Sequence, residues 1–519
     1  MALFDRIFPF QGGLKLQGRK SLSAGKPTAI VPLPRQLILP LQQHIGTAGR
    51  VVVQPGDRVL KGQLLAEADG FVSAALHAPT SGVVAAIESR PIIHPSGLSA
   101  LCLVLDSDGE DRWSDALPPP VDDFTTLDPA EIRRRVRDAG IVGLGGAAFP
   151  TAVKLNPVNN ARLDLLIING IECEPYITCD DQLMRDRAAA VIGGVLIIRH
   201  ALGVDQTLVA VEDDKPEAAA ALKTALDQCG ATAAGITLRT VPTRYPSGGE
   251  KQLIHLLTGR EVPSHGLPSE IGVVCQNVGT AAAVYEAIVQ GRPLISRYVA
   301  VTGEGIREPQ VVNALIGTPI SELVAQCGGY HDQVERLIAG GPMMGIALDS
   351  DRLPLTKGSN CILATAAPAA TTTLPCIRCG ACAEACPAQL LPQQLYWYAR
   401  NRDFDKTQDY KLFDCIECGC CAAVCPSQLP LVQYYRYAKT EIGAREQERR
   451  QSDIARQRHQ ARQARLELEK QQKAERLKKK QQALQQNGND SEDPKKSAIA
   501  AALARAKAKK NPVADTVDD

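Results

Sequence analysis

Residues 376–387 read Cys-Ile-Arg-Cys-Gly-Ala-Cys-Ala-Glu-Ala-Cys-Pro, and residues 415–426 read Cys-Ile-Glu-Cys-Gly-Cys-Cys-Ala-Ala-Val-Cys-Pro. Both runs space their cysteines as C-x2-C-x2-C-x3-C and end on proline. The similarity continues beyond the cysteines, because Tyr-Trp-Tyr-Ala-Arg at 396–400 corresponds to Tyr-Arg-Tyr-Ala-Lys at 435–439. This part of the chain is therefore an internal duplication, and its thiols are the strongest chemical signal in the sequence.

The spacing resembles that of bacterial ferredoxins with two clusters. In such runs three thiolates on a tight turn bind one [4Fe-4S] cubane, while the fourth cysteine points away and binds the other. The proline after each run stands at a helix start, where a missing N–H costs nothing. The spacing predicts one cluster on Cys376, Cys379, Cys382 and Cys425, and a second on Cys386, Cys415, Cys418 and Cys421.

Two zinc ribbons are the alternative, since C-x2-C pairs also hold zinc. The ferredoxin spacing is favoured because it occurs twice, with four cysteines in each run. Cys420 is expected to be a bystander, and clusters that need thiolates favour a reducing compartment. The other cysteines are expected to be buried and unreactive; they are Cys102, Cys173, Cys179, Cys229, Cys275, Cys327 and Cys361.

The composition limits the class of protein. A chain of 519 residues should form several domains. With 58 basic and 57 acidic residues there is no overall positive field, so we expect no nucleic-acid partner. The N-terminus lacks the features of a signal peptide, and no apolar run reaches 18 residues, so no transmembrane helix is expected. Contact with a membrane should then be peripheral or through partners.

Composition and pattern divide the chain into six parts. The phrases Gly-Asp-x-Val-x-x-Gly-Gln-x-Leu at 56–65 and Ala-Pro-x-x-Gly-x-Val at 78–84 resemble lipoyl/biotinyl barrel-sandwich hybrids. No lysine lies near Asp69-Gly70 to carry a prosthetic group, and His77 is expected to be a structural turn residue. We predict an extended lead (1–40), a barrel-sandwich β domain (41–110), a Rossmann-like α/β domain (122–291), a β-grasp module similar to soluble-ligand-binding domains (297–350), a helical twin-cluster domain (365–440) and a charged tail (441–519).

Within the α/β domain, the pattern predicts helices at 129–139 and 215–228 and strands at 163–169, 208–211 and 236–241. Residues 365–374 read as the linker to the cysteine-rich part. In the tail, residues 441–486 carry 13 basic and 7 acidic side chains, residues 487–494 break the pattern, and a helix is expected at 497–510. A solvated helix or disorder is favoured there, and a tether to anionic lipid or an acidic partner is the alternative.

Four polar segments of the α/β domain could form one pocket. The Gly-rich turn with Gly143, Gly145 and Gly146, followed by Lys154, suits a phosphate. Asn169, Glu172 and Glu174 follow a buried strand, at the edge where α/β sheets bind ligands. Gly248, Gly249 and Glu250 open one helix, and Asn277 and Thr280 open another. His255 and His265 are expected to be structural.

The order G-x-G-G-A-x-F-P-T-x-x-K, N-x-x-E-x-E-P, G-G-E and N-V-x-T is similar to that of the flavoprotein NADH-binding subunit of respiratory complex I. With the barrel-sandwich and twin-cluster parts, residues 1–440 resemble the RnfC component of the Rnf (Rsx) electron-transport complex. This resemblance implies that FMN and NADH bind here. It places Lys154, Asn169, Asn277 and Thr280 on the flavin phosphate and ribityl chain; Gly248, Gly249 and Glu250 along the isoalloxazine and nicotinamide; Glu172 and Glu174 by the nicotinamide or its ribose; and Phe149 stacked on the dinucleotide.

The complex I pattern has Arg and Gly where this chain has Leu144 and Ala148, and two acids where it has Gly249-Glu250. The resemblance therefore specifies the flavin more closely than the nucleotide. It implies a translocase-class NADH:ferredoxin-type oxidoreductase subunit in which hydride transfer to flavin feeds the two clusters one electron at a time. No side chain is expected to act as catalytic acid or base.

The expected partners are NAD(H), a ferredoxin or ferredoxin-like subunit, and the other subunits of a membrane-bound Rnf-type complex that couples electron transfer to ion transport. The expected location is the cytoplasmic face of the bacterial inner membrane. Three alternatives remain open. The chain could be an electron wire without nucleotide chemistry, a scaffold whose pocket has lost its flavin, or the related subunit of the sodium-pumping NADH:quinone reductase, which lacks the ferredoxin runs.

Overall fold

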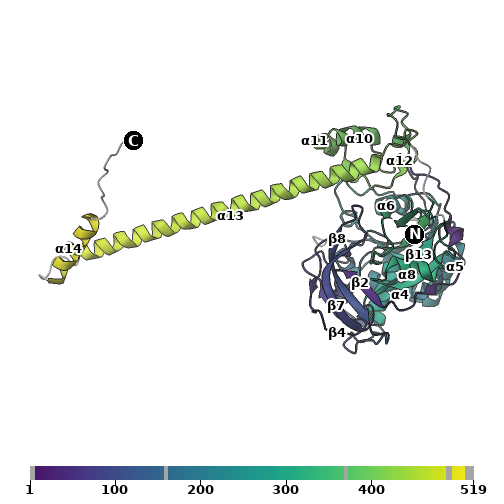
Figure 1. Ribbon diagram of the computed structural model, residues 1–519, viewed down its shortest axis with the longest axis horizontal. Helices are drawn as coiled ribbons and strands as arrows, with labels where there is room; N and C mark the ends of the chain where they lie inside the picture. The colour runs from purple at the N-terminus through teal and green to yellow at the C-terminus, as the bar shows by residue number, and fades with distance from the viewer. Residues whose placement is uncertain (1–5, 157–161, 333, 367–371, 487–493, 509–519) are drawn as a thin grey trace. The chain divides into compact units, whose positions relative to one another are not determined.

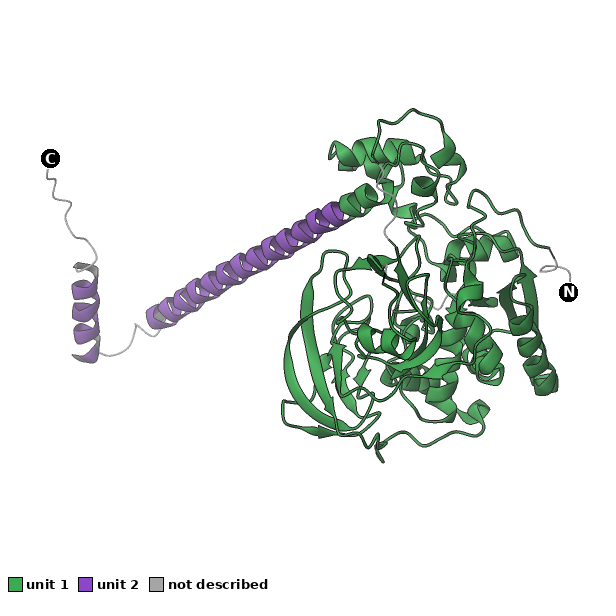
Figure 2. Cartoon of the chain, turned by 45° about the vertical axis from the view of Figure 1, so that its right-hand side comes forward, with its two compact units in different colours: residues 1–439 green, residues 440–519 purple. Residues whose placement is uncertain are grey.

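The computed structural model describes residues 6–156, 162–332, 334–366, 372–486 and 494–508. The chain divides into two compact units, residues 1–439 and residues 440–519 (Figure 2). The first unit contains all the β-sheets of the described residues, and the second is helical. The predicted multidomain fold, with β, α/β, β-grasp and helical cysteine-rich parts, is confirmed.

Two small antiparallel sheets form the barrel-sandwich part (Figure 1). In the first, the strands lie in the order β2 (Gln36–Pro40), β8 (Ser99–Ser107), β7 (Gly82–Pro91) and β4 (Arg58–Val59). The second contains β3 (Arg50–Val51), β5 (Leu64–Glu67) and β6 (Leu76–His77). Leu39 of β2 and Leu103 and Leu105 of β8 are fully buried in its core. Because β2 pairs with β8, this fold begins before residue 41, inside the predicted lead.

The α/β part is built on four parallel strands in the order β11 (Ile236–Val241), β10 (Gln206–Glu212), β9 (Leu165–Gly170) and β12 (Val273–Asn277). Both faces are covered, which is why β9 is apolar along almost its whole length. One face shares a core with α1 (Pro129–Asp138), α4 (Ala188–Leu202), α5 (Pro216–Cys229) and α7 (Val278–Val289). The other face packs against α6 (Glu250–Thr258). The predicted elements lie within two residues of these bounds.

Helices α4 and α7 approach each other closely at Gly194. A Cβ atom at this position would lie 1.8 Å from the backbone oxygen of Ala281, so only glycine fits. The apolar run at 191–198 lies in α4 and is mostly buried in the core. Within the described part of the chain, no helix is both long and apolar enough to cross a membrane.

The β-grasp part is a six-stranded mixed sheet with α8 (Ile320–Gln326) packed against it. Its strands lie in the order β1 (Ala29–Ile30), β14 (Gln310–Leu315), β13 (Ser296–Thr302), β17 (Cys361–Thr365), β15 (Arg336–Ala339) and β16 (Ile346–Leu348). Two of these strands lie outside the range 297–350. Strand β1 comes from the N-terminal lead, and β17 occupies a central position although it follows the predicted module by ten residues or more.

The cysteine-rich part repeats its backbone as well as its sequence. Gly380 and Gly419 adopt left-handed φ angles of 83° and 80° and precede the short helices α9 (Ala381–Glu384) and α12 (Cys420–Ala423). Arg378 and Glu417, at equivalent positions, have left-handed φ angles of 57° and 59°. Two further helices separate the copies, α10 (Pro392–Arg400) and α11 (Phe404–Asp409). Much of the predicted linker, residues 367–371, lies outside the described residues.

The described residues of the second unit are helical. Helix α13 (Leu431–Gln486) begins in the first unit and continues through most of the described tail, and α14 (Pro494–Ala508) follows. The side chains described between 443 and 485 are exposed, and spaced ion pairs such as Arg456–Asp453 at 3.5 Å line the helix. This matches the predicted solvated helix; the predicted break lies, apart from Pro494, outside the described residues. The other short helices are α2 (Thr151–Lys154), α3 (Cys179–Asp186) and 3-10 turns at Lys20–Leu22, Phe124–Thr126, Gly230–Ala233, Pro268–Ile271 and Leu412–Asp414.

The contact between α4 and α7 gives a test of the packing. Gly194→Ala should lower the free energy of unfolding by about 1–3 kcal/mol, because the added methyl group overlaps the α7 backbone. Gly443→Ala is the matched control, since Gly443 is also helical and has open space around it, where alanine favours the helix. Thermal or chemical unfolding of both variants measures the difference. Equal stability of the two variants would contradict the packing described here.

Candidate functional site: two cysteine cavities and a glycine-rich sheet edge

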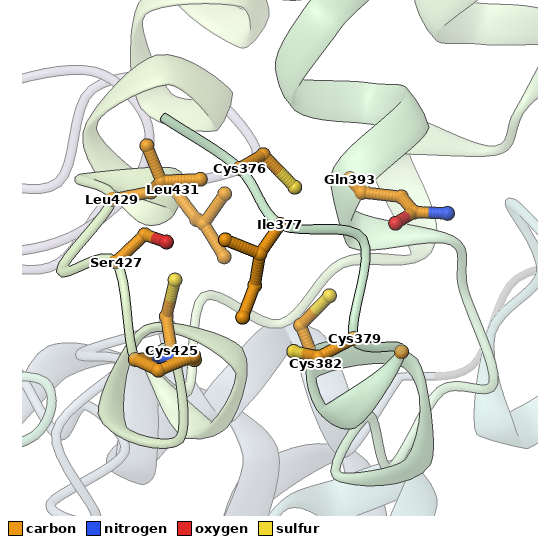
Figure 3. Close-up of a pocket in the computed structure, with 11 residues that line it drawn as sticks. Cys376, Ile377, Cys379, Cys382, Gln393, Cys425, Ser427, Leu429 and Leu431 are labelled. Carbon is orange, nitrogen blue, oxygen red and sulfur yellow. The ribbon is translucent and has the colours of Figure 1, made fainter. Parts of the chain in front are cut away.

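Four cysteines line the first cavity. Cys376, Cys379 and Cys382 come from the first run, and Cys425 comes from the end of the second. Figure 3 shows their sulfur atoms around the side chain of Ile377. Ile377 is 68% exposed and Cys379 is exposed, so this cavity opens toward solvent.

The second cavity has the complementary set of thiols. Cys415, Cys418 and Cys421 come from the second run, and Cys386 comes from the end of the first. Apolar side chains, among them Leu395, Val432 and Tyr435, complete its wall. The structure thus brings together the two interleaved sets that the spacing predicts.

Backbone amides point at several of these sulfur atoms. Arg378 donates its N–H to Cys376 Sγ and Glu417 donates its N–H to Cys415 Sγ, both at 3.4 Å. The left-handed backbone at Arg378 and Glu417 directs these two donors. Burial raises the pKa of the Cys415 thiol to about 11 and also raises the pKa of Cys386, so these thiols become thiolates only beside positive charge. Iron would supply that charge.

The separation of the sulfur atoms distinguishes the two candidate metals. A tetrahedral zinc site with Zn–S bonds of about 2.3 Å holds its sulfur atoms about 3.8 Å apart. In the described residues, the only three potential metal ligands within 4.8 Å of one another are Glu172, Cys179 and Asp180, so no three cavity sulfurs lie that close. Among the described residues, the cavity sulfurs are therefore not arranged as a closed tetrahedral zinc site.

Cys420 does not line either cavity, as expected for a bystander, but it contacts one of the predicted ligands. It is fully buried, and a hydrogen bond with its side chain lowers the pKa of the Cys418 thiol. This contact could not be inferred from the spacing, because it depends on how the turn at 418–421 folds.

The predicted flavin residues gather at the carboxyl edge of the parallel sheet. Asn169 lies near the end of β9 and Asn277 ends β12, and the two are direct neighbours in the sheet register. The chain leaves β9 for β10 on one side and returns to β12 on the other, so this is the point where the strand order reverses. Ligands of α/β sheets bind outside such a switch point.

Side-chain amides fix this edge. Asn277 accepts a hydrogen bond from the Gly279 N–H at 2.8 Å, which caps α7, and donates to Asp180 Oδ2 at 2.6 Å. Asn169 donates its side-chain N–H to the Gly248 backbone oxygen at 2.9 Å. The segment around Gly248 is thereby held against β9.

The glycine-rich turn lies beside the start of α7. Leu144 donates its N–H to Thr280 Oγ1 at 3.0 Å, and Gly143 donates its N–H to the Phe149 backbone oxygen at 2.8 Å. A Cβ atom at Gly145 would lie 3.4 Å from the Asn277 side chain, whereas Gly146, with φ 105°, faces open space. Gly143, Gly145, Gly146, Asn277 and Thr280 are therefore brought together as predicted from the sequence.

Lys154 and Glu250 meet each other at the same edge. Lys154 ends α2, and its Nζ donates to Glu250 Oε1 at 2.6 Å and to the Cys275 backbone oxygen at 3.2 Å. Glu250 is the first residue of α6, directly after Gly248 and Gly249. The ammonium group of Lys154 is thus held within reach of the switch point.

Two buried cationic side chains bind backbone oxygens in or next to the glycine-rich turn, and neither was identified from the sequence. Arg297 donates to the backbone oxygen of Leu144 at 3.2 Å and also to that of Lys357. Lys357 donates from Nζ to the backbone oxygens of Gly140 and Ala75, each at 2.7 Å. Burial lowers the pKa of Lys357 to about 7. Single cationic residues far from the motif carry no sequence signal for this role.

These features fit a phosphate-bearing cofactor. Gly145 and Gly146 expose the backbone of the turn beside the N-terminus of α7, and Lys154 and Arg297 supply positive charge near them. Ser247 Oγ and Gln276 Nε2 are buried at this edge without a hydrogen-bond partner among the described residues. Such orphaned polar atoms are expected where a ligand supplies the missing partner.

Glu172 and Glu174 have protein partners instead of facing the turn. Glu172 Oε1 accepts the Asp180 N–H at 2.8 Å at the start of α3, and burial raises the pKa of Glu172. Glu174 Oε1 accepts the N–H groups of Met343 and Met344, each at 2.8 Å. Their predicted contact with the nicotinamide or its ribose remains a prediction, as does the stacking of the half-buried Phe149.

Comparison with known proteins follows the same division of the chain. Family models match as the RnfC barrel sandwich hybrid domain (residues 8–110), the Nuo51 FMN-binding domain (136–286), the SLBB domain (298–347) and the 4Fe-4S dicluster domain (375–429). Among solved structures, the NAD+-reducing [NiFe]-hydrogenase in the H2-reduced state is 20% identical, with a TM-score of 0.45 over 61% of this chain and 63% of that chain.

Several curated relatives are named as the C subunit of an ion-translocating oxidoreductase complex. The protein of Pseudomonas aeruginosa is 49% identical over 90% of this chain and 60% of its own length. That of Vibrio cholerae is 47% identical over 97% and 65%, and that of Serratia proteamaculans is 48% identical over 97% and 70%. The chain thus spans less than two thirds of the length of the first two relatives.

The interleaving predicts which variants lose the same cluster. Cys425→Ser should remove about half of the iron, because one of two [4Fe-4S] clusters is lost. Adding Cys376→Ser should remove no more iron, since Cys376 lines the same cavity, whereas adding Cys415→Ser should remove the remainder. Iron analysis and electron paramagnetic resonance of anaerobic protein measure this, with Cys420→Ser as the control that keeps both clusters. If adding Cys376→Ser removed the remaining iron and adding Cys415→Ser removed no more, the interleaved arrangement would be excluded.

Lys357 predicts a pH dependence of stability. Its pKa is about 7 in the folded protein against 10.5 in the unfolded chain, so the unfolded state binds more protons between these values. Stability should therefore rise with pH across this window, by up to about 1.4 kcal/mol per pH unit from this group. Lys357→Met, of similar length, should remove this contribution. The measurement is the free energy of unfolding of the wild type and of Lys357→Met from pH 7 to 10. The same pH dependence in both proteins would contradict the burial of an amine without a charged partner.

Proposed function

The chain belongs to the RnfC family, the C subunits of ion-translocating oxidoreductase complexes, and we propose that it is the electron-input subunit of such a complex. In this proposal it oxidises NADH and passes the electrons through FMN and two [4Fe-4S] clusters. The observation that carries the proposal is the presence, in one compact unit, of two complete cysteine cavities and a phosphate-suited sheet edge.

FMN converts the two-electron hydride chemistry of NADH into the one-electron chemistry that iron-sulfur clusters require. The contribution of the chain is binding and orientation. The backbone of Gly145 and Gly146, the start of α7 and the ammonium of Lys154 would hold the phosphate. Asn169 fixes the segment of Gly248 and Gly249, along which the ring system would lie.

No side chain is assigned a proton-transfer role in this proposal. The ionisable groups nearest the edge are engaged with protein partners: Lys154 with Glu250, and Asp180 with Asn277. The contact with Asp180 fixes Asn277, and the hydrogen bond to the Gly248 oxygen fixes Asn169, so in this proposal the chain positions the cofactor rather than reacting itself. The buried side chains of Cys418, Cys421 and Tyr435 likewise shield the second cavity from solvent.

The proposed partners follow from the family. We propose that the electrons pass to, or come from, a ferredoxin or ferredoxin-like subunit, and that membrane subunits of the complex couple this transfer to ion translocation. The chain would then lie at the cytoplasmic face of the inner membrane as a peripheral subunit. The solvent-exposed side of the first cavity, at Ile377 and Cys379, supports exchange of electrons with another protein.

A second candidate is an electron wire without nucleotide chemistry. The observation in its favour is that the carboxylates of Glu172 and Glu174, expected at the nicotinamide, bind backbone amides of this chain. Under this alternative the clusters would still relay electrons, but NADH would not be oxidised.

Anaerobic purification and reduction separate the two candidates. The protein should contain one FMN per chain, and NADH should bleach first the flavin absorbance and then that of the clusters. Lys154→Met should weaken FMN binding about tenfold to a hundredfold, because one charge-assisted hydrogen bond to phosphate is lost. Lys251→Met is the control, because Lys251 follows Glu250 in α6 but donates to the Pro263 backbone oxygen, and the FMN affinity of this variant should be unchanged. If the purified protein contained both clusters but no flavin and did not oxidise NADH, only the electron-wire function would remain.

A further inference from the structure

The α/β part and the second cysteine cavity meet in a small buried cluster. Tyr245, Cys418 and Cys420 belong to it, with exposed fractions of 2%, 7% and 0%, and Cys173 packs against them. Cys418 lines the second cavity, whereas Tyr245 lies three residues before Gly248 at the flavin edge. The cluster therefore joins the two proposed cofactor sites.

Tyr245 connects the two sites through its hydroxyl group. The hydroxyl donates a hydrogen bond to the Cys418 backbone oxygen at 2.6 Å. On the other side, Gly248 donates its N–H to Cys173 Sγ at 3.4 Å and accepts from Asn169 at 2.9 Å. From Gly248 to Cys418 the path thus consists of covalent bonds and one short hydrogen bond.

The N-terminal lead holds this contact from a third direction. Leu14 and Tyr245 exchange two backbone hydrogen bonds, at 2.7 and 2.9 Å. Gly13 donates its N–H to the Ala385 oxygen at 3.0 Å, next to Cys386 of the second cavity. At Gly12 a Cβ atom would lie 2.6 Å from the Cys386 oxygen, so the backbones touch. The position of Tyr245 relative to the cavity is therefore fixed at both ends.

The two cavities differ in what surrounds them. Cys418 and Cys421 of the second cavity are buried, and their turn faces the α/β part through Tyr245. Cys379 of the first cavity is exposed, and Ile377 above it is 68% exposed. The second cavity is thus the one in contact with the flavin edge.

We propose that Tyr245 is a positioning residue for electron transfer, whose hydroxyl couples the Gly248 segment to the cluster held by Cys418. This rests on the proposed function and assigns a residue to its internal step. One electron at a time crosses the contact: the donor on the Gly248 side is oxidised by one electron, the acceptor on the Cys418 side is reduced by one, and no bond forms or breaks. The hydrogen bond also polarises the Cys418 peptide, which tunes the potential of the acceptor.

Tyr245→Phe tests this with the ring and its packing kept. Tyr330→Phe is the control, because Tyr330 also donates its hydroxyl in a hydrogen bond, to Asp351 Oδ2 at 3.2 Å, but lines neither cysteine cavity. In Tyr245→Phe, iron and flavin contents should be unchanged. The midpoint potential of one cluster should become more negative, and the reduction of the clusters after that of the flavin should slow several-fold. Tyr330→Phe should transfer electrons at the wild-type rate.

Potentials are measured by redox titration monitored by electron paramagnetic resonance, and rates by anaerobic stopped flow. An unchanged rate and potential in Tyr245→Phe would overturn the inference, as would an equal slowing in Tyr330→Phe. Loss of iron from Tyr245→Phe would also overturn it, because the hydroxyl would then maintain the cavity. Failure of the proposed function is distinct: if NADH does not reduce the wild-type flavin, the flavin can be photoreduced, and the titration needs no NADH.

Discussion

The exchange of cysteines between the two runs is the constraint on which the rest depends. Cys425 lines the cavity of the first run, and Cys386 lines the cavity of the second, so neither cavity is complete without both copies. The left-handed backbone at Gly380 and Gly419 allows each turn to present three thiols, and the short helix that follows carries the fourth away. Two cofactor sites are thereby held close together by one folding unit, which suits the relay of single electrons.

The other domains converge on the proposed flavin edge. Lys357 joins the Ala75 oxygen of the barrel-sandwich part to the Gly140 oxygen at the start of the glycine-rich turn, and Arg297 of β13 binds the Leu144 oxygen in that turn. The barrel-sandwich and β-grasp parts are therefore linked to the turn by hydrogen bonds. The lead residues Gly12 to Leu14 join the same edge to the second cavity. Contacts from the barrel-sandwich part, the β-grasp part and the lead thus meet at this edge.

Local patterns in the sequence were sufficient to predict the cysteine sets, the parallel strands and the glycine-rich turn, because each depends on spacing within a short segment. Contacts between distant segments were not predictable. Lys357 meets its partners across 282 and 217 residues, and β17 enters the β-grasp sheet from beyond the predicted range. Glu172 and Glu174 have the spacing of ligand residues, yet their carboxylates bind amides supplied by α3 and by Met343 and Met344. Sequence spacing identifies candidate ligand-binding residues. Which groups these residues contact depends on the fold.

The central claim is that each cluster is bound by three thiols of one run and one thiol of the other. Diffraction data collected at the iron absorption edge from crystals of anaerobically prepared protein test it most directly. Two separate iron sites are expected, one among Cys376, Cys379, Cys382 and Cys425 and the other among Cys386, Cys415, Cys418 and Cys421. A single iron site, or two sites each surrounded by the four spaced cysteines of one run, would contradict it.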